Sequence, residues 1–320
     1  MIALTFNEFG TSEVLNYIEV PDPVLSKGEI LVQNKAIGLN YADIYRRKGN
    51  YHLKGEPPFI AGYEGAGVVT ASNSEKYNIG DRIAYTDVPF ANAEYTKLPE
   101  SHAIPIPDDI DYNMAASVLL QGLTAHYLIN DSHNVAKGET ILVHAASGGV
   151  GQIITQLCKA KGAKVIGLSR SEDKLQTILD NGADHAVKLD DKWKSKVAEI
   201  TGNIGVDVAY DSVGSTLKDS FAVTRDCGHV VFYGMSGGDP EPVDPRMLMD
   251  TSKTLTGGDL WSYLNSEKER HERANLLFDL IRKGTLKIKD PVIFNLSEGS
   301  KAHDYLENGK STSKVLLIPD

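Results

Sequence analysis

The stretch ILVHAASGGVGQ, residues 141–152, changes abruptly from branched apolar residues to small residues and then to glycines. The apolar residues predict the end of a buried strand, and the residues after the glycines predict a helix. A loop with almost no side chains leaves backbone N–H groups open at the helix N-terminus, where they and the helix dipole can bind a phosphate. Ala146, Gly148 and Gly151 match Ala-x-Gly-x-x-Gly, a variant of the dinucleotide fingerprint. A plain tight turn is the alternative interpretation.

Each small residue of this loop has a physical reason in the dinucleotide interpretation. A side chain at Gly148 or Gly149 would hold a pyrophosphate away from the backbone, and Gly151 would allow the helix to pack closely on the strand. We therefore expect cofactor contacts along the whole loop, from Ala146, Ser147, Gly148, Gly149, Val150 and Gly151.

The pattern around the loop predicts an α/β fold. The first hundred residues are rich in short β-strand patterns separated by Gly, Pro and Asp. From about residue 120, five apolar strands alternate with helices of about ten residues, which is typical of a doubly wound parallel sheet of the Rossmann type. Residues 265–284 predict one amphipathic helix, with Leu276, Leu277, Leu280 and Ile281 on its apolar face.

Composition limits the class of protein. Of the 320 residues, 41% are hydrophobic and 24% are charged, which is enough for a folded core, and the formal net charge of −10 argues against a nucleic-acid surface. Cys158 and Cys227 cannot form a disulfide framework or a cysteine-based metal cluster. The chain begins without a signal-peptide pattern, and no apolar run approaches the ~20 residues of a membrane span. We expect a cytoplasmic location and no membrane contact.

The end of the second Rossmann strand predicts the cofactor. NAD enzymes usually place an Asp or Glu there, about twenty residues after the loop, to bind the ribose 2′-OH. This chain has Ser169 at that position, with Arg170 next to it and Lys174 one turn later. Hydroxyl and cationic groups suit a 2′-phosphate, so the sequence predicts NADPH. Ordinary surface charges are the alternative for Arg170 and Lys174.

No metal site is expected. A catalytic zinc needs about three Cys, His or carboxylate ligands. Neither cysteine lies in the β-rich part, and its two histidines, His52 and His102, have no partner at a suitable spacing. Hydride delivery to an acceptor that is already electrophilic, such as a quinone or an enone, fits a site without a Lewis acid.

The spacing that starts at Gly138 extends well beyond the glycines. It runs through Gly138-Glu139, Leu142, the glycine loop, Gln156 and Lys159. This pattern resembles the zinc-independent quinone oxidoreductase and zeta-crystallin group of the medium-chain dehydrogenase/reductases, and the similarity covers nearly the whole chain. The resemblance implies a GroES-like catalytic domain in two parts, 1–121 and 263–320, around a Rossmann domain at 122–262, with a cleft between the domains.

The resemblance also implies site residues. Positions that carry zinc ligands in zinc-dependent relatives hold Asn40 and Gly62-Tyr63-Glu64 here. The nicotinamide ring is expected near Asn40, Asp43, Tyr45 and Tyr51. Further cofactor contacts are implied for Thr124, Lys174, Tyr233, Gly234, Ser236 and Lys314. The chain departs from its relatives at Leu189 and at Ser313, where the usual Gly-Lys pair reads Ser-Lys, so the adenine-side contacts are left open.

Three functions stay open at this point. The first is NADPH-dependent quinone reduction by hydride or single-electron transfer, with Asn40 and Tyr45 bonding the quinone oxygen and Tyr51 covering its ring. Core packing is the alternative for the two tyrosines, and a helix-cap role for Asp43. The second is reduction of the C=C bond of a 2-alkenal or enone. The third, from a different class, is NADPH-responsive RNA binding, which the acidic composition disfavours. The family resemblance implies a homodimer.

Overall fold

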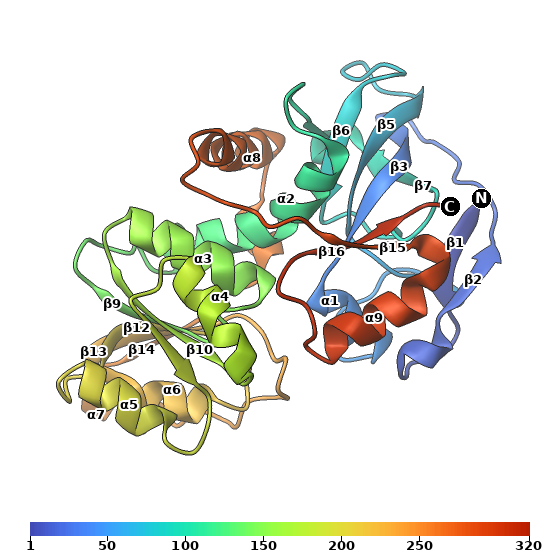
Figure 1. The fold of residues 1–320 in the computed structure, drawn as a ribbon. Helices are drawn as coiled ribbons and strands as arrows, with labels where there is room; N and C mark the ends of the chain where they lie inside the picture. Colours follow the sequence, from blue (N-terminus) through green and yellow to red (C-terminus); the bar gives the residue numbers. More distant parts are fainter. The chain divides into compact units, whose positions relative to one another are not determined.

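The structure is a computed structural model that describes residues 1–320 and contains two compact units (Figure 1). Unit 1 comprises Met1–Leu120, Leu264–Ile281 and Lys287–Asp320, and unit 2 comprises Gln121–Tyr263 and Arg282–Leu286. The crossings at Leu120/Gln121 and Tyr263/Leu264 each lie within one residue of an expected boundary. The exception is Arg282–Leu286, a short segment that lies with unit 2 inside the expected return segment.

Unit 2 contains a six-stranded parallel sheet, in the order β11-β10-β9-β12-β13-β14. Its strands are β9 (Thr140–Val143), β10 (Lys164–Ser169), β11 (His185–Lys188), β12 (Val206–Asp211), β13 (Thr224–Phe232) and β14 (Thr254–Gly257). The sequence predicted five of these strands and missed β14. That edge strand reads TLTG, and so short a segment with alternating threonines has little apolar signal.

Helices cover both faces of this sheet (Figure 1). Helices α3 (Gly149–Ala160) and α4 (Leu175–Asp180) pack on one face, and α5 (Trp193–Ile200) and α6 (Leu217–Val223) pack on the other. A further helix, α7 (Pro245–Thr251), precedes β14. The strand order reverses between β9 and β12, and ligands of doubly wound sheets bind at the carboxyl ends of the strands at such a point. The fold class expected from the sequence is confirmed.

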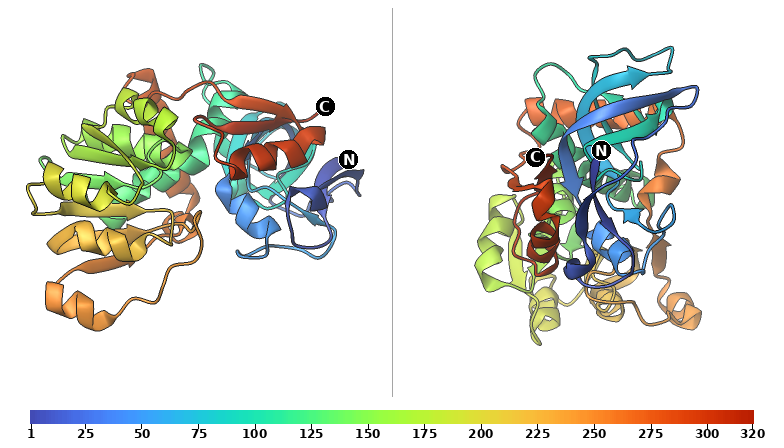
Figure 2. Two further views of the ribbon diagram at one scale, coloured as in Figure 1. Left: turned by 60° about the horizontal axis from the view of Figure 1, so that its bottom comes forward. Right: turned by 90° about the vertical axis from the view of Figure 1, so that its right-hand side faces the viewer.

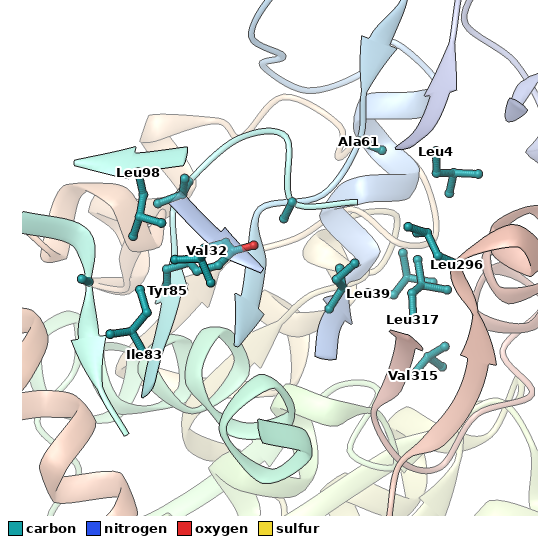
Figure 3. Packing of buried hydrophobic residues seen from close by; sticks show 14 of the residues in the cluster. Leu4, Val32, Leu39, Ala61, Ile83, Tyr85, Leu98, Leu296, Val315 and Leu317 are labelled. Carbon is teal, nitrogen blue, oxygen red and sulfur yellow. The ribbon is translucent and has the colours of Figure 1, made fainter. Parts of the chain in front are cut away.

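Unit 1 is built on a mixed sheet of seven strands, in the order β15-β16-β3-β5-β6-β8 with β7 also paired to β3. These strands are β3 (Glu29–Leu39), β5 (Glu64–Ser72), β6 (Arg82–Thr86), β7 (Tyr95–Pro99), β8 (Ile104–Pro105), β15 (Val292–Asn295) and β16 (Val315–Ile318). A second sheet joins β1 (Ile2–Phe6) to β2 (Asn16–Glu19) and β4 (Phe59–Ile60). Apolar residues from both sheets and from the turn after β15 form one core, which includes Leu4, Val32, Ile83, Leu296 and Leu317 (Figure 3).

The C-terminal part of the chain completes unit 1. Strand β16 pairs with β3, and helix α9 (Gly299–Glu307) packs beside the N-terminal segment, as Figure 2 shows in red and blue. Helix α1 (Tyr41–Arg47) follows β3 directly, and helix α2 (Tyr112–Tyr127) runs from unit 1 into unit 2. No helix in the structure has the length and apolar character needed to cross a membrane.

Helix α8 (Glu267–Arg282) forms where the amphipathic pattern predicted it, but its buried face differs from the predicted one. Arg270, Ala274, Leu277 and Phe278 are buried, whereas Leu276 is 42% exposed. The prediction that Leu276 lies on the buried face is therefore wrong. The prediction placed the buried face from apolar residues alone. It therefore missed Arg270, a charged residue that belongs to the buried face.

Candidate active site

The glycine loop forms a bare junction between β9 and α3. Ala145 adopts a left-handed conformation with φ of 47°, and its carbonyl accepts the Gly148 N–H at 2.8 Å, which closes the turn. Helix α3 begins at Gly149, and the N–H groups of Gly149, Val150 and Gly151 donate to no carbonyl oxygen. In a helix of twelve residues, these amides and the helix dipole form an arrangement that binds anions.

Gly151 sets how closely the helix approaches the loop. A Cβ atom at this position would lie 2.5 Å from the carbonyl oxygen of Ala145 and 2.7 Å from the Cα of Ala146. Both neighbours are backbone atoms that cannot rotate away, so only glycine fits here. This is the close packing that the fingerprint predicts for its last glycine.

Helix α3 is fixed to the rest of unit 2 by the residues that carry the longer sequence pattern. Gln152 donates to the Ser147 carbonyl at 2.8 Å, and Gln156 donates to Asn181 Oδ1 at 2.9 Å. Lys159 pairs with Asp184 at 2.8 Å. The spacing of Gln156 and Lys159 therefore has a structural reason, because both side chains attach the helix to the segment between α4 and β11.

The end of β10 carries no carboxylate where NAD enzymes usually have one. Ser169 is buried, and its hydroxyl oxygen accepts from Ser147 Oγ at 3.3 Å and from the Ser171 N–H at 3.2 Å. Arg170 is exposed and Lys174 is half-buried. Burial lowers the pKa of Lys174, and the charge of Arg170 lowers it further, while Asp173 opposes both. The structure thus brings two cations near a serine-lined strand end.

The two acids in this segment are already paired. The carboxylate of Asp173 accepts from the Ser171 hydroxyl, and Glu172 pairs with Lys188 at 3.1 Å. Each carboxylate thus has a local partner, and Asp173 also opposes the lowering of the Lys174 pKa.

The loop after β13 packs against the loop after β12. The Tyr233 N–H donates to the Asp211 carbonyl at 2.9 Å, and both the N–H and the hydroxyl of Ser236 donate to the Ser212 carbonyl at 3.1 Å. A Cβ at Gly234 would lie 3.0 Å from the same Ser212 oxygen. Tyr233, Gly234 and Ser236 thus share one surface at the carboxyl ends of the strands. Thr124, the remaining implied contact of unit 2, is half-buried on α2.

Asp211 is a residue that sequence reasoning missed. Its buried carboxylate accepts from the Val213 N–H at 2.8 Å and from the Ser220 hydroxyl at 2.6 Å, and Ser220 in turn accepts from His144 Nε2 at 2.9 Å. Burial alone would raise the pKa of Asp211, but His144 and these donors hold it below its usual range. The network joins the residue before the glycine loop to the loop after β12. An aspartate at a strand end followed by small residues was the available signal.

In unit 1 the structure brings the predicted residues of the catalytic domain together around α1. Asn40 caps the helix, and its N–H donates to Asp43 Oδ2 at 2.9 Å. Asp43 Oδ1 accepts from Arg46 Nη1 at 3.1 Å. Burial raises the pKa of Asp43, although Arg46 opposes this shift. The helix-cap alternative for Asp43 thus matches its contacts.

Aromatic rings surround the same helix. The Tyr45 ring meets the Tyr51 ring at a centroid distance of 6.3 Å, and both tyrosines are half-buried. The guanidinium of Arg46 lies 5.0 Å from the Tyr51 centroid and 3.5 Å from the Tyr63 centroid. Sequence reasoning missed Arg46, because a basic residue in a short helix usually faces water. Here it is 1% exposed and links the aspartate to the aromatic rings.

Lys314 lies in unit 1, where it is almost completely buried before β16. Its ammonium donates to Glu64 Oε2 at 2.6 Å and to Asn40 Oδ1 at 2.7 Å. The sequence prediction grouped Lys314 with the cofactor residues. The other residues of that group lie in unit 2.

The structure contains no group of three or more His, Cys, Asp or Glu side chains arranged to hold a metal ion. At the positions of zinc ligands in zinc-dependent relatives, an amide, a phenol and a carboxylate are present, and the carboxylate of Glu64 already pairs with Lys314. Such a donor set does not fit the Cys- and His-rich sites that zinc favours.

Comparisons with known proteins agree with this architecture. Residues 26–140 match the family model described as an alcohol dehydrogenase GroES-like domain, and residues 149–276 match the model described as a zinc-binding dehydrogenase. A quinone oxidoreductase of Pseudomonas aeruginosa is 35% identical over 99% of both chains. A 2-haloacrylate reductase of a Burkholderia species is 33% identical over 91% of both chains.

A solved structure extends the similarity to three dimensions. The crystal structure of Escherichia coli quinone oxidoreductase complexed with NADPH superposes with a TM-score of 0.94, at 33% identity and over the full length of both chains. Sequence and fold similarity of this extent lead to one assignment: the chain belongs to the quinone oxidoreductase family of the medium-chain dehydrogenase/reductases.

Proposed function

We propose that this protein is an NADPH-dependent oxidoreductase that reduces quinones. The observation that carries the proposal is the pairing of a bare glycine loop with a strand end that has Ser169, Arg170 and Lys174 but no acidic residue in the ribose position. The P. aeruginosa relative is a quinone oxidoreductase, and the E. coli structure holds NADPH. These comparisons support the same cofactor and the same acceptor class.

Unit 2 has the groups that NADPH needs. The free amides of Gly149, Val150 and Gly151 would hold the pyrophosphate, and Arg170 and Lys174 would hold the 2′-phosphate beside Ser169. Tyr233, Gly234, Ser236 and Thr124 remain proposed contacts of the rest of the cofactor. When bound, NADPH supplies the hydride, so the protein contributes mainly binding and orientation.

Unit 1 has the groups proposed for the acceptor. Tyr45 and Tyr51 offer aromatic faces for a quinone ring and phenolic O–H groups for its oxygens. The amide of Asn40 is already bonded at both ends, to Lys314 and to Glu64, so we assign it an orienting role. Asp43 holds the start of α1 through the Asn40 N–H.

We further propose that the reaction uses no zinc, because an ammonium–carboxylate pair is present where zinc-dependent relatives have their ligands. Turnover should then be unaffected by prolonged treatment with a strong chelator, and metal analysis of the active protein should show less than about 0.1 zinc per chain, against the full occupancy of a closed site. Loss of activity on chelation that zinc restores would contradict this.

The test of the function is a steady-state assay with both nicotinamide cofactors and several acceptors. NADPH with 1,4-naphthoquinone should give the highest kcat/KM, and NADH should give a kcat/KM lower by about tenfold or more, equivalent to about 1.4 kcal/mol. NADPH deuterated at C4 should slow the reaction if hydride transfer limits it. Absence of quinone turnover while NADPH binds tightly would reject the proposal.

Reduction of an activated C=C bond is a second candidate, supported by the similarity to a 2-haloacrylate reductase. The assay therefore includes a 2-alkenal and 2-chloroacrylate beside the quinone. Turnover of the alkenal or the acrylate alone would replace the first candidate with the second. RNA binding remains a minor alternative, which filter binding at physiological salt, with NADPH as competitor, would test.

We also propose a homodimer in a reducing, cytoplasmic setting. Strand β14 forms one edge of the unit 2 sheet, and we expect a second copy to pair along it. Both cysteines are unpaired, in keeping with a reducing compartment. Sedimentation of a monomer at micromolar concentration would contradict the homodimer.

A further inference from the structure

Four charged side chains are buried around the start of α1. Glu64 and Asp43 contribute two carboxylates, and Lys314 and Arg46 contribute two cations. The side chains form two pairs, Lys314 with Glu64 and Arg46 with Asp43, and none is more than 1% exposed. Asn40 contacts members of both pairs, through its side chain and its N–H respectively.

The Asn40 amide is held in one orientation. Its oxygen accepts from the Lys314 ammonium at 2.7 Å, and its nitrogen donates to Glu64 Oε2 at 2.8 Å and to the Gly38 carbonyl at 3.2 Å. A flipped amide would place its NH₂ group against the ammonium and its oxygen against the carboxylate. Both contacts would be repulsive in a buried site, where unpaired polar groups are costly.

Glu64 is itself fixed from the opposite side. Its Oε1 accepts from the Leu120 N–H at 2.7 Å. A Cβ at Gly38 would overlap Glu64 Oε2, so glycine is needed for the carboxylate to reach Asn40. The network thus joins the ends of β3, β5 and β16 and helix α2 at one amide group.

We propose that Lys314 is a positioning residue that sets the orientation of the Asn40 amide, and through it the start of α1, rather than a ligand of the cofactor phosphates. Two of its three N–H donors are already used, and its side chain is 1% exposed. The inference rests on the proposed function, because acceptor turnover reports on the geometry of α1.

The test must separate positioning from stability. Lys314→Met alone leaves the Glu64 carboxylate buried without a counter-charge, and we expect it to unfold at a clearly lower temperature. The double variant Glu64→Gln/Lys314→Met has no buried charge at this pair and should recover most of the lost stability. Because methionine cannot donate to Asn40 Oδ1, the amide orientation should remain lost in the double variant.

The kinetics of the double variant then show whether Lys314 acts by positioning Asn40 or by binding the cofactor. We expect kcat for 1,4-naphthoquinone to fall by about tenfold or more, as for a displaced positioning group, while the Kd for NADPH stays within about twofold of the wild type. The matched control is Arg47→Met/Glu307→Gln, which removes an ion pair of a fully buried arginine in the same helix that does not contact Asn40. This control should retain kcat once its folding is verified.

Two results of the kinetic and binding measurements would overturn the inference. A rise of about tenfold or more in the Kd for NADPH, with no change for NADH, would make Lys314 a phosphate ligand. An unchanged kcat in the folded double variant would show that turnover does not depend on this contact.

A readout that needs no turnover separates this inference from the proposed function. In protein labelled with ¹⁵N-asparagine, the side-chain NH₂ protons of Asn40 should exchange slowly in the wild type and faster in the double variant. Quinone turnover that is absent from the wild type would reject the proposed function and leave this measurement valid. Equal exchange in both proteins would reject the positioning role.

Discussion

Two strand-to-helix junctions in this molecule have the same local topology and opposite chemistry. In unit 2, β9 leads into α3 through a loop of small residues, and the first amides of the helix have no carbonyl partner. In unit 1, β3 leads into α1 through Asn40, whose N–H and side chain are both bonded. The first junction leaves its donors for a ligand, and the second uses its donors to fix side chains.

The difference shows what each junction needs from its surroundings. The glycine loop works through backbone atoms, so it requires space and close packing more than particular neighbours. The start of α1 works through side chains, so it requires buried counter-charges from distant parts of the chain. Changes at the first junction should therefore act on cofactor binding, and changes at the second on stability and acceptor turnover.

The largest effect is expected at the second junction. Arg46→Met leaves the buried Asp43 carboxylate without its partner, which should lower the free energy of unfolding by about 3–5 kcal/mol. The double variant Asp43→Asn/Arg46→Met should regain much of this loss. Burial already raises the pKa of Asp43, so protonation in acid favours the folded variant and its deficit should shrink as the pH falls. Urea unfolding at several pH values measures both effects, and a deficit independent of pH would argue against the mechanism.

The next effect concerns the first junction. Gly151→Val places side-chain atoms against the backbone of Ala145 and Ala146, so α3 must move away from the loop. We expect the Kd for NADPH to rise on the order of 100-fold, about 2.7 kcal/mol, by fluorescence titration. Gly257→Ala in β14 is the control, because its Cβ would meet no atom within 4 Å. Equal Kd values for Gly151→Val and the wild type would mean that the loop does not bind the cofactor.

A smaller effect tests the cofactor preference of the same unit. Ser169→Asp introduces a carboxylate where the proposal places the 2′-phosphate, so the Kd for NADPH should rise about tenfold, or about 1.4 kcal/mol. The Kd for NADH should fall or stay unchanged. Ser195→Asp, on the exposed side of α5, controls for the added charge. If both variants weaken NADPH binding equally, the effect comes from the added charge at long range. Position 169 would then not adjoin the 2′-phosphate.

The smallest effect is a pH dependence. Burial and Arg170 lower the pKa of Lys174, so as the pH rises this lysine loses its charge earlier than an ordinary lysine. NADPH binding should therefore weaken by a few-fold, at most about 1 kcal/mol, on the alkaline side, while NADH binding stays constant. In Lys174→Met the alkaline weakening should disappear. If the Kd for NADPH depends on pH in the same way in the wild type and in Lys174→Met, Lys174 does not bind the phosphate.

Much of the fold was predictable from local patterns. The central strands of unit 2 are buried on both faces and read as apolar runs, and the glycine loop identifies which strand is first. Strand β14 was missed because an edge strand needs little apolar character. The inner face of α8 was misjudged because Arg270 is buried there beside His102, at 3.1 Å.

The residues of the candidate sites also fall into those that the sequence identified and those that it did not. The loop residues from Ala146 to Gly151 and the serine at position 169 were identifiable because their roles depend on neighbours in sequence. Asp211 and Arg46 were not, because their partners Val213 and Asp43 are near in sequence but the burial of these charges comes from the fold. The pairing of Lys314 with Glu64 was not, because the two residues lie 250 positions apart. Only the family resemblance drew attention to Lys314, and it did so for a different role.

The sequence by itself determined the five central strands of unit 2 with the helices between them, the bare loop and the absence of an acid at position 169. These features depend on residue size, periodicity and charge within a few positions. Tertiary structure alone decided that Asn40 is bonded at both ends of its amide and that Lys314 is a buried partner of Glu64. The physical reason is that a buried charge is tolerated only beside its counter-charge, and the fold, not the local sequence, brings the two together.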